Sequence, residues 1–278
     1  MKRLLPLFLI VLLLCACAPR QGGASEIAAS TRPVAQFAEA LLEGTDLTVT
    51  LLVSEPVSCL HDYTLSVGQA EQAEKAKLIL LSGAGLETFL ADLIRGKDTV
   101  DCAGEIELLT GDEGPDPHYW LDPALAKVMA QNLAAGLTER YPQHGETIAA
   151  NLAALEARLD DLAAYGAAKT ADLSHRDLIT FHDGFAYFAR SLDLNVLAAM
   201  EEEAGSEPAA KDLMQIVSLV REYDVPCVFA EENGSDAAAK VVAGETGVKI
   251  RTLSTALGTD DYFTAMTKNY DAIGEALS

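Results

Sequence analysis

The chain has 278 residues, of which 20 are basic and 42 are acidic, and half of all residues are hydrophobic. A formal charge of −22 argues against a nucleic-acid-binding protein and against electrostatic attachment to an anionic membrane, because both partners are negatively charged. The hydrophobic content excludes a disordered body. Three cysteines follow Cys17, too few for a disulfide scaffold or a cysteine-rich zinc module.

The N-terminal segment has the order typical of a secretory signal peptide. Lys2 and Arg3 precede an apolar run over residues 4–14, which is shorter than the roughly 20 residues of a membrane-spanning helix. Leu-Cys-Ala-Cys at 14–17 resembles the lipobox of bacterial lipoproteins, in which the small Ala16 precedes the lipidated residue, Cys17. We therefore expect a signal peptide over 1–16 and a protein lipid-anchored on the outer face of the cytoplasmic membrane, extracellular or periplasmic. An ordinary cleaved signal peptide is the alternative.

The remaining chain predicts an α/β protein. Residues 17–31 are small and polar and indicate a tether. Short apolar runs then alternate with helical stretches, a pattern typical of buried parallel strands. The helical patterns cover 32–44, 66–75, 86–94 and 122–141, and the predicted strands are 47–53, 77–81, 177–181, 193–198, 226–230 and 248–253.

One segment between the two halves predicts a long helix. Ile148, Leu152, Leu155, Leu159 and Leu162 are spaced by four, three, four and three residues, which gives a narrow apolar stripe. A helix over 146–167 would be roughly 33 Å long at 1.5 Å per residue. We interpret it as a strut that joins two lobes, with one more surface helix as the alternative. The predicted organisation is an N-terminal α/β lobe at 32–145, a connecting helix at 146–170 and a C-terminal α/β lobe at 171–278.

Two potential metal ligands follow predicted strands in the second half. His182 comes directly after the strand 177–181, and Glu231 after 226–230. Ligands of open parallel sheets bind beyond the carboxyl ends of the strands, so both side chains should face one cleft. For His182, a structural role at the start of the next helix is the alternative. The two histidines in polar loops, His144 and His175, are interpreted as solvated.

Two further histidines lie in the first half. His118 is part of DPHYWLDP at 116–123, where two prolines and an aromatic pair indicate a rigid loop that could present a ligand. His61, in CLHDY, lies in the loop that leaves the first predicted strand, and its spacing alone indicates nothing more than a loop residue.

These segments together resemble the zinc/manganese family of ABC-transporter substrate-binding proteins of the ZnuA/TroA type. The matching segments occur in family order: HDYTLSVGQ from 61, LSGAGLETFL from 81, DPHYWLDP from 116, TFHDGFAYFA from 180, SEPAAKDL from 206, VFAEEN from 228 and GVKI from 247. The resemblance implies two lobes, each with a parallel four-stranded sheet and flanking helices, joined by one long helix. It also implies a monomer that binds one metal ion between the lobes and delivers it to an ABC permease and its ATPase.

By the same resemblance, the metal ligands are His61 and His118 from the first lobe and His182 from the second. The manganese-type members have a carboxylate at the position of His182. The usual fourth ligand, an Asp shortly after the last strand, is missing from Leu253-Ser254-Thr255. Glu231, Asp260, Asp261 or a water molecule could take its place, and Glu231 is the preferred candidate. Three imidazoles and one oxygen suit Zn²⁺, whereas Mn²⁺ favours more oxygen ligands.

The sequence is compatible with several alternatives. The resemblance predicts a binding protein and not an enzyme, but three histidines with an open position also fit a secreted zinc hydrolase. A manganese-binding member and a lipoprotein adhesin are further alternatives within the family. Cys59 and Cys102 both lie near loops that border the expected cleft and are predicted to form a disulfide, whereas Cys227, in a buried strand, is expected to be a free thiol.

Overall fold

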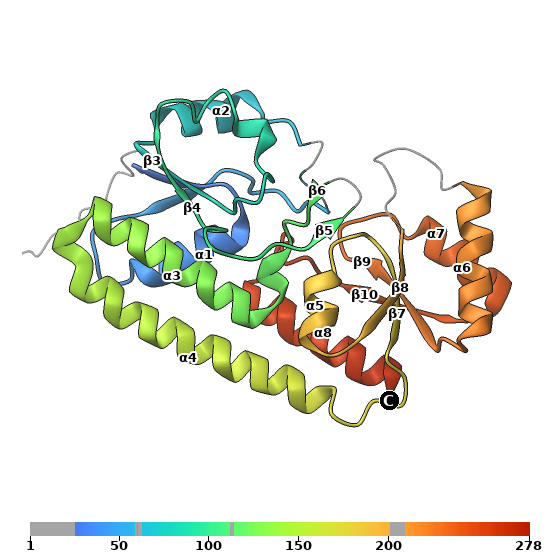
Figure 1. Ribbon diagram of the computed structural model, residues 1–278. Coiled ribbons are helices and arrows are strands. Elements are labelled where there is room, and N and C mark those ends of the chain that lie inside the picture. The colour runs from blue at the N-terminus through green and yellow to red at the C-terminus, as the bar shows by residue number, and fades with distance from the viewer. Residues whose placement is uncertain (1–25, 59, 61–62, 112–113, 201–208) are drawn as a thin grey trace, which may run out of the picture.

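The computed structural model describes residues 26–58, 60, 63–111, 114–200 and 209–278. These residues form two α/β lobes that lie side by side along one long helix (Figure 1). Each lobe contains a four-stranded sheet in which all neighbouring strands are parallel. The fold class predicted from the sequence is therefore confirmed.

The first lobe has the strand order β2-β1-β3-β4. Its strands are β1 Ile27–Ala29, β2 Val49–Leu51, β3 Leu78–Leu81 and β4 Asp98–Asp101. Its helices are α1 Arg32–Leu41, α2 Val67–Lys75 and α3 Pro123–Arg140, with short 3₁₀ turns at η1 Thr88–Leu90, η2 Tyr119–Leu121 and η3 Pro142–His144. A small antiparallel pair, β5 Thr110–Gly111 and β6 Gly114–Pro115, lies in the loop before η2.

The second lobe has the strand order β10-β9-β7-β8. Its strands are β7 Asp177–Phe181, β8 Asn195–Ala199, β9 Cys227–Glu231 and β10 Lys249–Leu253. Its helices are α5 Ala186–Ser191, α6 Ala210–Glu222, α7 Ala237–Thr246 and α8 Tyr262–Leu277.

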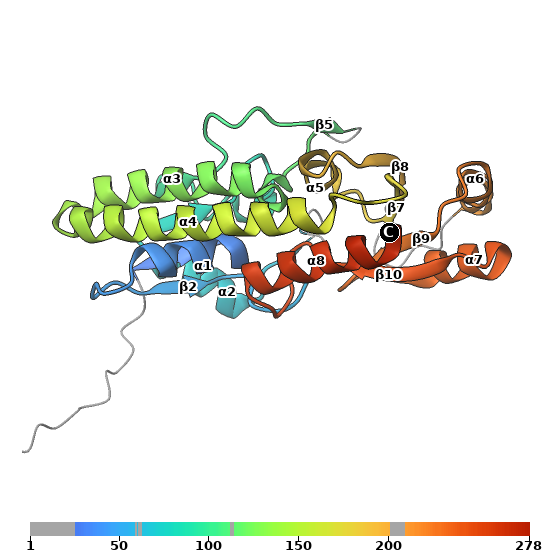
Figure 2. The same ribbon diagram turned by 90° about the horizontal axis from the view of Figure 1, so that it is seen from below.

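The connecting helix is α4, Gly145–Lys169, which agrees to within a residue at each end with the connecting helix predicted at 146–170. Seen from below, α4 runs beside α3 and also lies against α1 of the first lobe and α8 of the second (Figure 2). Its apolar stripe packs into one core cluster that includes Phe37 of the first lobe and Tyr270 of the second. The two lobes therefore share a hydrophobic core through this helix.

Side-chain alternation along the strands divides the remaining core. In β3, Leu78 and Leu80 pack into the shared core, whereas Ile79 and Leu81 pack on the opposite face with residues of α2. In the second lobe, the opposite face of the sheet packs against α6 and α7. Both sheets are thus covered on two sides, and the carboxyl ends of their strands face the region between the lobes.

The structure corrects two local predictions and adds one strand that was not predicted. Residues 27–29 were assigned to the tether, but they form β1, a fully buried strand inside the first sheet. β4 was not predicted, because it is an edge strand whose residues are mostly exposed and show no apolar run. The helical pattern at 86–94 contains only the short turn η1. Within the described ranges, no helix is both long and apolar enough to cross a membrane.

A buried carboxyl group lies at the carboxyl ends of the first sheet. Glu87 is 7% exposed, and its Oε1 accepts hydrogen bonds from Ser30 Oγ at 2.7 Å and from the backbone N–H of Ser82 at 2.6 Å. Its Oε2 accepts one from the Gly83 N–H at 3.1 Å. Burial is the main cause that raises the pKa of Glu87 to about 7, and nearby Asp101 adds to the shift.

This carboxyl group should make the stability of the metal-free protein depend on pH. A glutamate with an ordinary pKa of 4.5 in the unfolded chain and about 7 in the folded chain favours folding at low pH. That contribution is lost as the pH rises from about 4.5 to above 7, and it amounts to about 3 kcal/mol.

We expect the free energy of unfolding in urea, with a chelator present, to fall less between pH 5 and pH 8 in Glu87→Gln than in the wild type. Glu139→Gln, at an exposed position in α3, serves as the control and should keep the wild-type pH dependence. An unaltered pH dependence in Glu87→Gln would contradict the assignment.

Candidate metal site

Two buried histidines from different lobes meet in the region between the sheets. His118 comes from the loop at the start of η2, and His182 follows β7 directly. Their side chains are 2% and 3% exposed, their rings are nearly perpendicular, and their Nε2 atoms are 3.4 Å apart. Two nitrogens bound to one tetrahedral zinc at 2.0–2.1 Å lie about 3.3 Å apart, so this spacing fits two ligands of one ion.

The tautomer of His118 is set by a neighbouring carboxylate. Asp116 Oδ1 lies 2.9 Å from His118 Nδ1 and also accepts the backbone N–H of His118 at 2.9 Å. A carboxylate only accepts hydrogen bonds, so Nδ1 is the nitrogen that carries the proton. The Nε2 atom that faces His182 therefore has its lone pair available, as a metal ligand requires. Asp116 belongs to the DPHYWLDP motif, but no feature of the sequence assigns it this role.

A glycine allows the two rings to pack closely. A Cβ atom at Gly184 would lie 2.7 Å from the His182 ring and 3.1 Å from the His118 ring. Any side chain at this position would meet the imidazole of His182, so the absence of one leaves room for the observed ring positions. No pattern in the sequence distinguishes this glycine from an ordinary loop glycine.

Glu231, the preferred candidate for the fourth ligand, is the last residue of β9. It is 3% exposed; its Oε2 accepts the Asn233 N–H at 2.8 Å, and its Oε1 accepts the Thr255 hydroxyl at 3.3 Å. It also accepts a hydrogen bond from Ser58, which lies in the first lobe on the loop after β2. Burial is the largest effect on this carboxyl group and raises its pKa, which these hydrogen bonds partly offset. Glu231 thus contacts the loop that carries His61.

Neutral hydrogen bonds join the two lobes around the histidines. The Trp120 indole N–H donates to the Thr255 carbonyl at 2.9 Å, and the Tyr262 hydroxyl donates to the Trp120 carbonyl at 2.7 Å. The Tyr187 hydroxyl accepts the Leu109 N–H at 2.7 Å and donates to the Asp116 carbonyl at 3.0 Å. The loop that carries His118 is therefore attached to the second lobe on both sides of the histidine.

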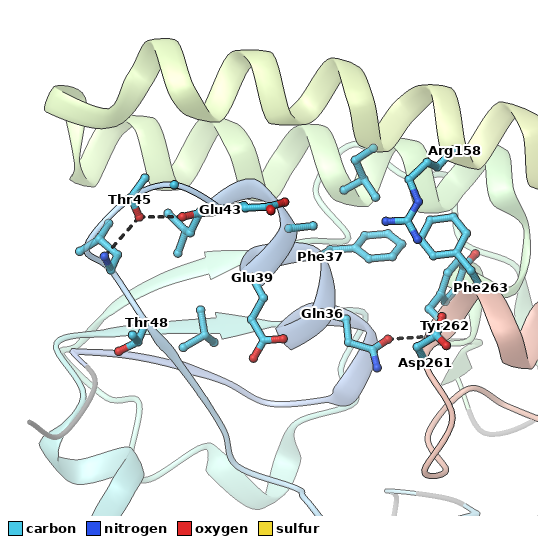
Figure 3. Close-up of a pocket in the computed structure, with 16 residues that line it drawn as sticks. Gln36, Phe37, Glu39, Glu43, Thr45, Thr48, Arg158, Asp261, Tyr262 and Phe263 are labelled. Carbon is cyan, nitrogen blue, oxygen red and sulfur yellow. Dashed lines mark hydrogen bonds between the residues drawn. The ribbon is translucent and has the colours of Figure 1, made fainter. Parts of the chain in front are cut away.

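The other carboxylates considered as a fourth ligand have different partners. Asp260 forms an ion pair with Lys268, and Asp261 caps the start of α8 through Thr264. Asp261 also lines a groove of about 830 Å³ between α1, β2, α4 and the start of α8 (Figure 3). The residues that line this groove include no histidine and no cysteine.

Three of the predicted site residues are not described by the structure. His61, Cys17 and Cys59 lie outside the described residues. Across the described ranges, no three His, Cys, Asp or Glu side chains are grouped closely enough to hold a metal, so Glu231 does not complete a three-residue group with the two histidines.

The two loop histidines are only partly buried and lie apart from the site. His144 pairs with Asp46, with its Nε2 3.1 Å from the carboxylate, and His175 precedes β7. As predicted, Cys227 is a free, buried thiol. Cys102 is also a free, buried thiol in this structure, which gives no support to its predicted disulfide with Cys59.

Comparison with known proteins decides the family. The sequence model of the family described as "Zinc-uptake complex component A periplasmic" (ZnuA) matches residues 27–276. The chain belongs to the ZnuA family. The crystal structure of ZnuA superposes with a TM-score of 0.80 at 28% sequence identity, and the match covers 92% of this chain and 100% of that one.

Streptococcal relatives of this ZnuA-family chain extend the comparison. The zinc-binding lipoprotein AdcA of Streptococcus pneumoniae is 26% identical over 292 residues, which cover 96% of this chain. The crystal structure of Zn(II)-bound AdcA from the same species has a TM-score of 0.79 at 25% identity and covers 92% of this chain and 58% of that one. The chain spans little more than half the length, 56% and 57%, of the curated AdcA relatives.

The contact between Asp116 and His118 leads to a prediction for metal affinity. Asp116→Asn keeps the shape but removes the charge and permits the other imidazole tautomer, so we expect zinc to bind about 10- to 100-fold more weakly. The matched control is Asp46→Asn, which changes the partner of His144 away from the site. Competition against a chromophoric chelator measures both. Equal affinities for the Asp116 variant and the wild type would show that Asp116 does not orient a ligand.

Proposed function

We propose that this protein is the extracytoplasmic zinc-binding component of an ABC metal importer. The single observation that carries the proposal is the 3.4 Å separation of the His118 and His182 Nε2 atoms, contributed by different lobes. In this role zinc is the transported substrate and not a resident cofactor. Family membership and the zinc-binding names of the relatives support the proposal.

His61 is the proposed third ligand. The residues on both sides of it are held in place: Ser58 bonds to Glu231 across the cleft, and Leu60 is fully buried in the first-lobe core. Tyr63 donates a hydrogen bond to Glu55 and accepts one from Gln69 at 2.7 Å. The described residues that flank His61 in the sequence are therefore fixed, and Ser58 lies against Glu231 of the second lobe.

Glu231 is the proposed fourth ligand, with water as its competitor. Its buried carboxylate is costly to ionise, and a nearby cation would offset that cost. Its hydrogen bonds with Thr255 and Ser58 would have to rearrange for the carboxylate to reach an ion held by the histidines. If they persist, Glu231 instead holds the loop of His61 in place, and water completes the coordination.

The proposed donor set favours zinc over manganese. Three imidazole nitrogens and one oxygen match the four-coordinate preference of Zn²⁺, whereas Mn²⁺ favours carboxylate, carbonyl and water oxygens. Because the nitrogens come from two lobes, a bound ion would stabilise the arrangement in which the lobes are apposed. A permease could then distinguish the loaded from the empty protein by this shift in population.

The proposed location follows from the N-terminal sequence. Lipid chains on Cys17 would anchor the protein outside the cytoplasmic membrane, because each buried CH₂ contributes about 0.8 kcal/mol and two or more chains give stable attachment. We expect Cys17→Ala to move the protein from the membrane pellet to the soluble fraction. A variant that stays in the pellet would contradict the lipid anchor.

Substitution of the histidines tests the ligand set. We expect His118→Ala and His182→Ala each to lower zinc affinity by several orders of magnitude, a larger loss than the roughly 10- to 100-fold typical of residues that only support a ligand. The double variant His144→Ala, His175→Ala should bind as the wild type does and is the internal control. Isothermal titration or chelator competition gives the dissociation constants.

Two outcomes separate the parts of the proposal. Zinc affinity that is unchanged in His182→Ala would remove the two-lobe site. A loss in Glu231→Gln no greater than about 100-fold would assign Glu231 to support of the ligands instead of coordination.

A further inference from the structure

Glu87 has no place in the proposed ligand set, although it is one of the most deeply buried carboxyl groups of the first lobe. It is 7% exposed and contacts no histidine in the hydrogen bonds described above. Burying a carboxylate is unfavourable unless its oxygens are satisfied, and three donors converge on this one. The arrangement suggests that Glu87 organises the backbone around it.

One peptide unit connects Glu87 to the loop of the metal site. The N–H of Gly83 donates to Glu87 Oε2 at 3.1 Å, and the carbonyl of the same peptide unit, that of Ser82, accepts the Tyr119 hydroxyl at 2.6 Å. Hydrogen bonds at both ends of a peptide group polarise one another and strengthen together. Glu87 and Tyr119 are therefore linked through a single backbone amide.

Tyr119 is the residue after His118, and it is fully buried. Its neighbour Trp120 is bound to Thr255 of the second lobe, whereas the Tyr119 hydroxyl is bound to the first-lobe sheet through Ser82. The Ser82 hydroxyl is in turn 2.8 Å from the Thr31 hydroxyl. The bond between Tyr119 and Ser82 thus fixes the His118 loop to its own lobe.

We propose that Glu87 is a positioning residue of the metal site, which orients the His118 imidazole through the 82–83 peptide and Tyr119. The inference rests on the proposed role of His118 as a metal ligand. It assigns a function to a buried acid that makes no contact with the ion.

The chemistry explains why a carboxylate stands at this position. Two backbone N–H groups and one hydroxyl point at Glu87, and two acceptor oxygens are needed to satisfy both N–H groups. A glutamine has one acceptor oxygen, and its NH₂ group would face the other N–H as a second donor. Asp101, Cys102 and Tyr119 are the other titratable groups close to Glu87. Each of them is neutral or negative, so no cation replaces the backbone donors.

The test combines Glu87→Gln, Tyr119→Phe and the double variant in the full chain. Because the effect reaches His118 only through the 82–83 peptide and Tyr119, we expect each single substitution to weaken zinc binding about 3- to 10-fold, less than loss of a direct partner. The double variant should lose little more than either single variant, because both interrupt the same path. With cobalt in place of zinc, the variants should show d–d absorption bands that differ from those of the wild type, because these bands report the geometry of the ligands.

The chain offers a matched control. Tyr141 is also a buried tyrosine of the first lobe, but its hydroxyl has no hydrogen-bond partner among the described residues. Tyr141→Phe removes the same atom without breaking the path, and its zinc affinity and cobalt spectrum should match those of the wild type. Thermal unfolding of every variant establishes that it is folded.

The outcomes separate this inference from the proposed function. Wild-type zinc affinity and cobalt spectrum in both single variants, with or without a change in melting temperature, would overturn the positioning role and leave His118 as a ligand. Fully additive losses in the double variant would also overturn it. Imidazole nitrogen NMR of the metal-free protein gives a readout that does not need zinc: an unshifted His118 signal in folded Glu87→Gln would overturn the inference even if the wild type failed to bind zinc.

Discussion

The close approach of two imidazoles from separate lobes is the constraint on which the site depends. His118 and His182 have their Nε2 atoms 3.4 Å apart, although 64 residues separate them in the chain. Small changes in the angle between the lobes would move these atoms apart. The shared core around α4, together with the hydrogen bonds of Trp120 and Tyr187, limits such changes. These contacts between the lobes therefore keep the two Nε2 atoms close together.

Three buried or partly buried carboxylates make specific hydrogen bonds around the two histidines. Asp116 fixes the proton of His118, and Glu231 joins the second sheet to the loop of His61 through Ser58. Glu87 accepts hydrogen bonds from two backbone N–H groups and one hydroxyl, and the 82–83 peptide links it to Tyr119 in the His118 loop. Each buried acid is matched to specific donors, which offsets part of its desolvation. The general acidity of the chain, by contrast, identified no site.

The sequence predicted the second lobe better than the first for a physical reason. Strands such as β7 and β9 are runs of five residues with a clear apolar pattern, whereas β1 is three residues long and lies beside a polar segment. A strand that short has no recognisable period, so only its neighbours in the sheet define it. The edge strand β4 carries mostly exposed side chains and gave no signal either.

Only part of the candidate site could be predicted from the sequence. The positions of His118 and His182 followed from motifs and from the ends of predicted strands, because these are local properties. The roles of Asp116, Gly184 and Thr255 depend on contacts that form only when the lobes come together, and no spacing encodes them. The sequence favoured Glu231 over Asp260 and Asp261 only because Glu231 ends a predicted strand, whereas the fold gives both aspartates other partners.

Diffraction from crystals of the zinc-loaded protein, recorded on both sides of the zinc absorption edge, tests the two-lobe site most directly. The account predicts one anomalous peak about 2.0–2.1 Å from the Nε2 atoms of both His118 and His182, with His61 as a further ligand. A peak bonded to only one of the two histidines, or located away from the region between the lobes, would contradict it.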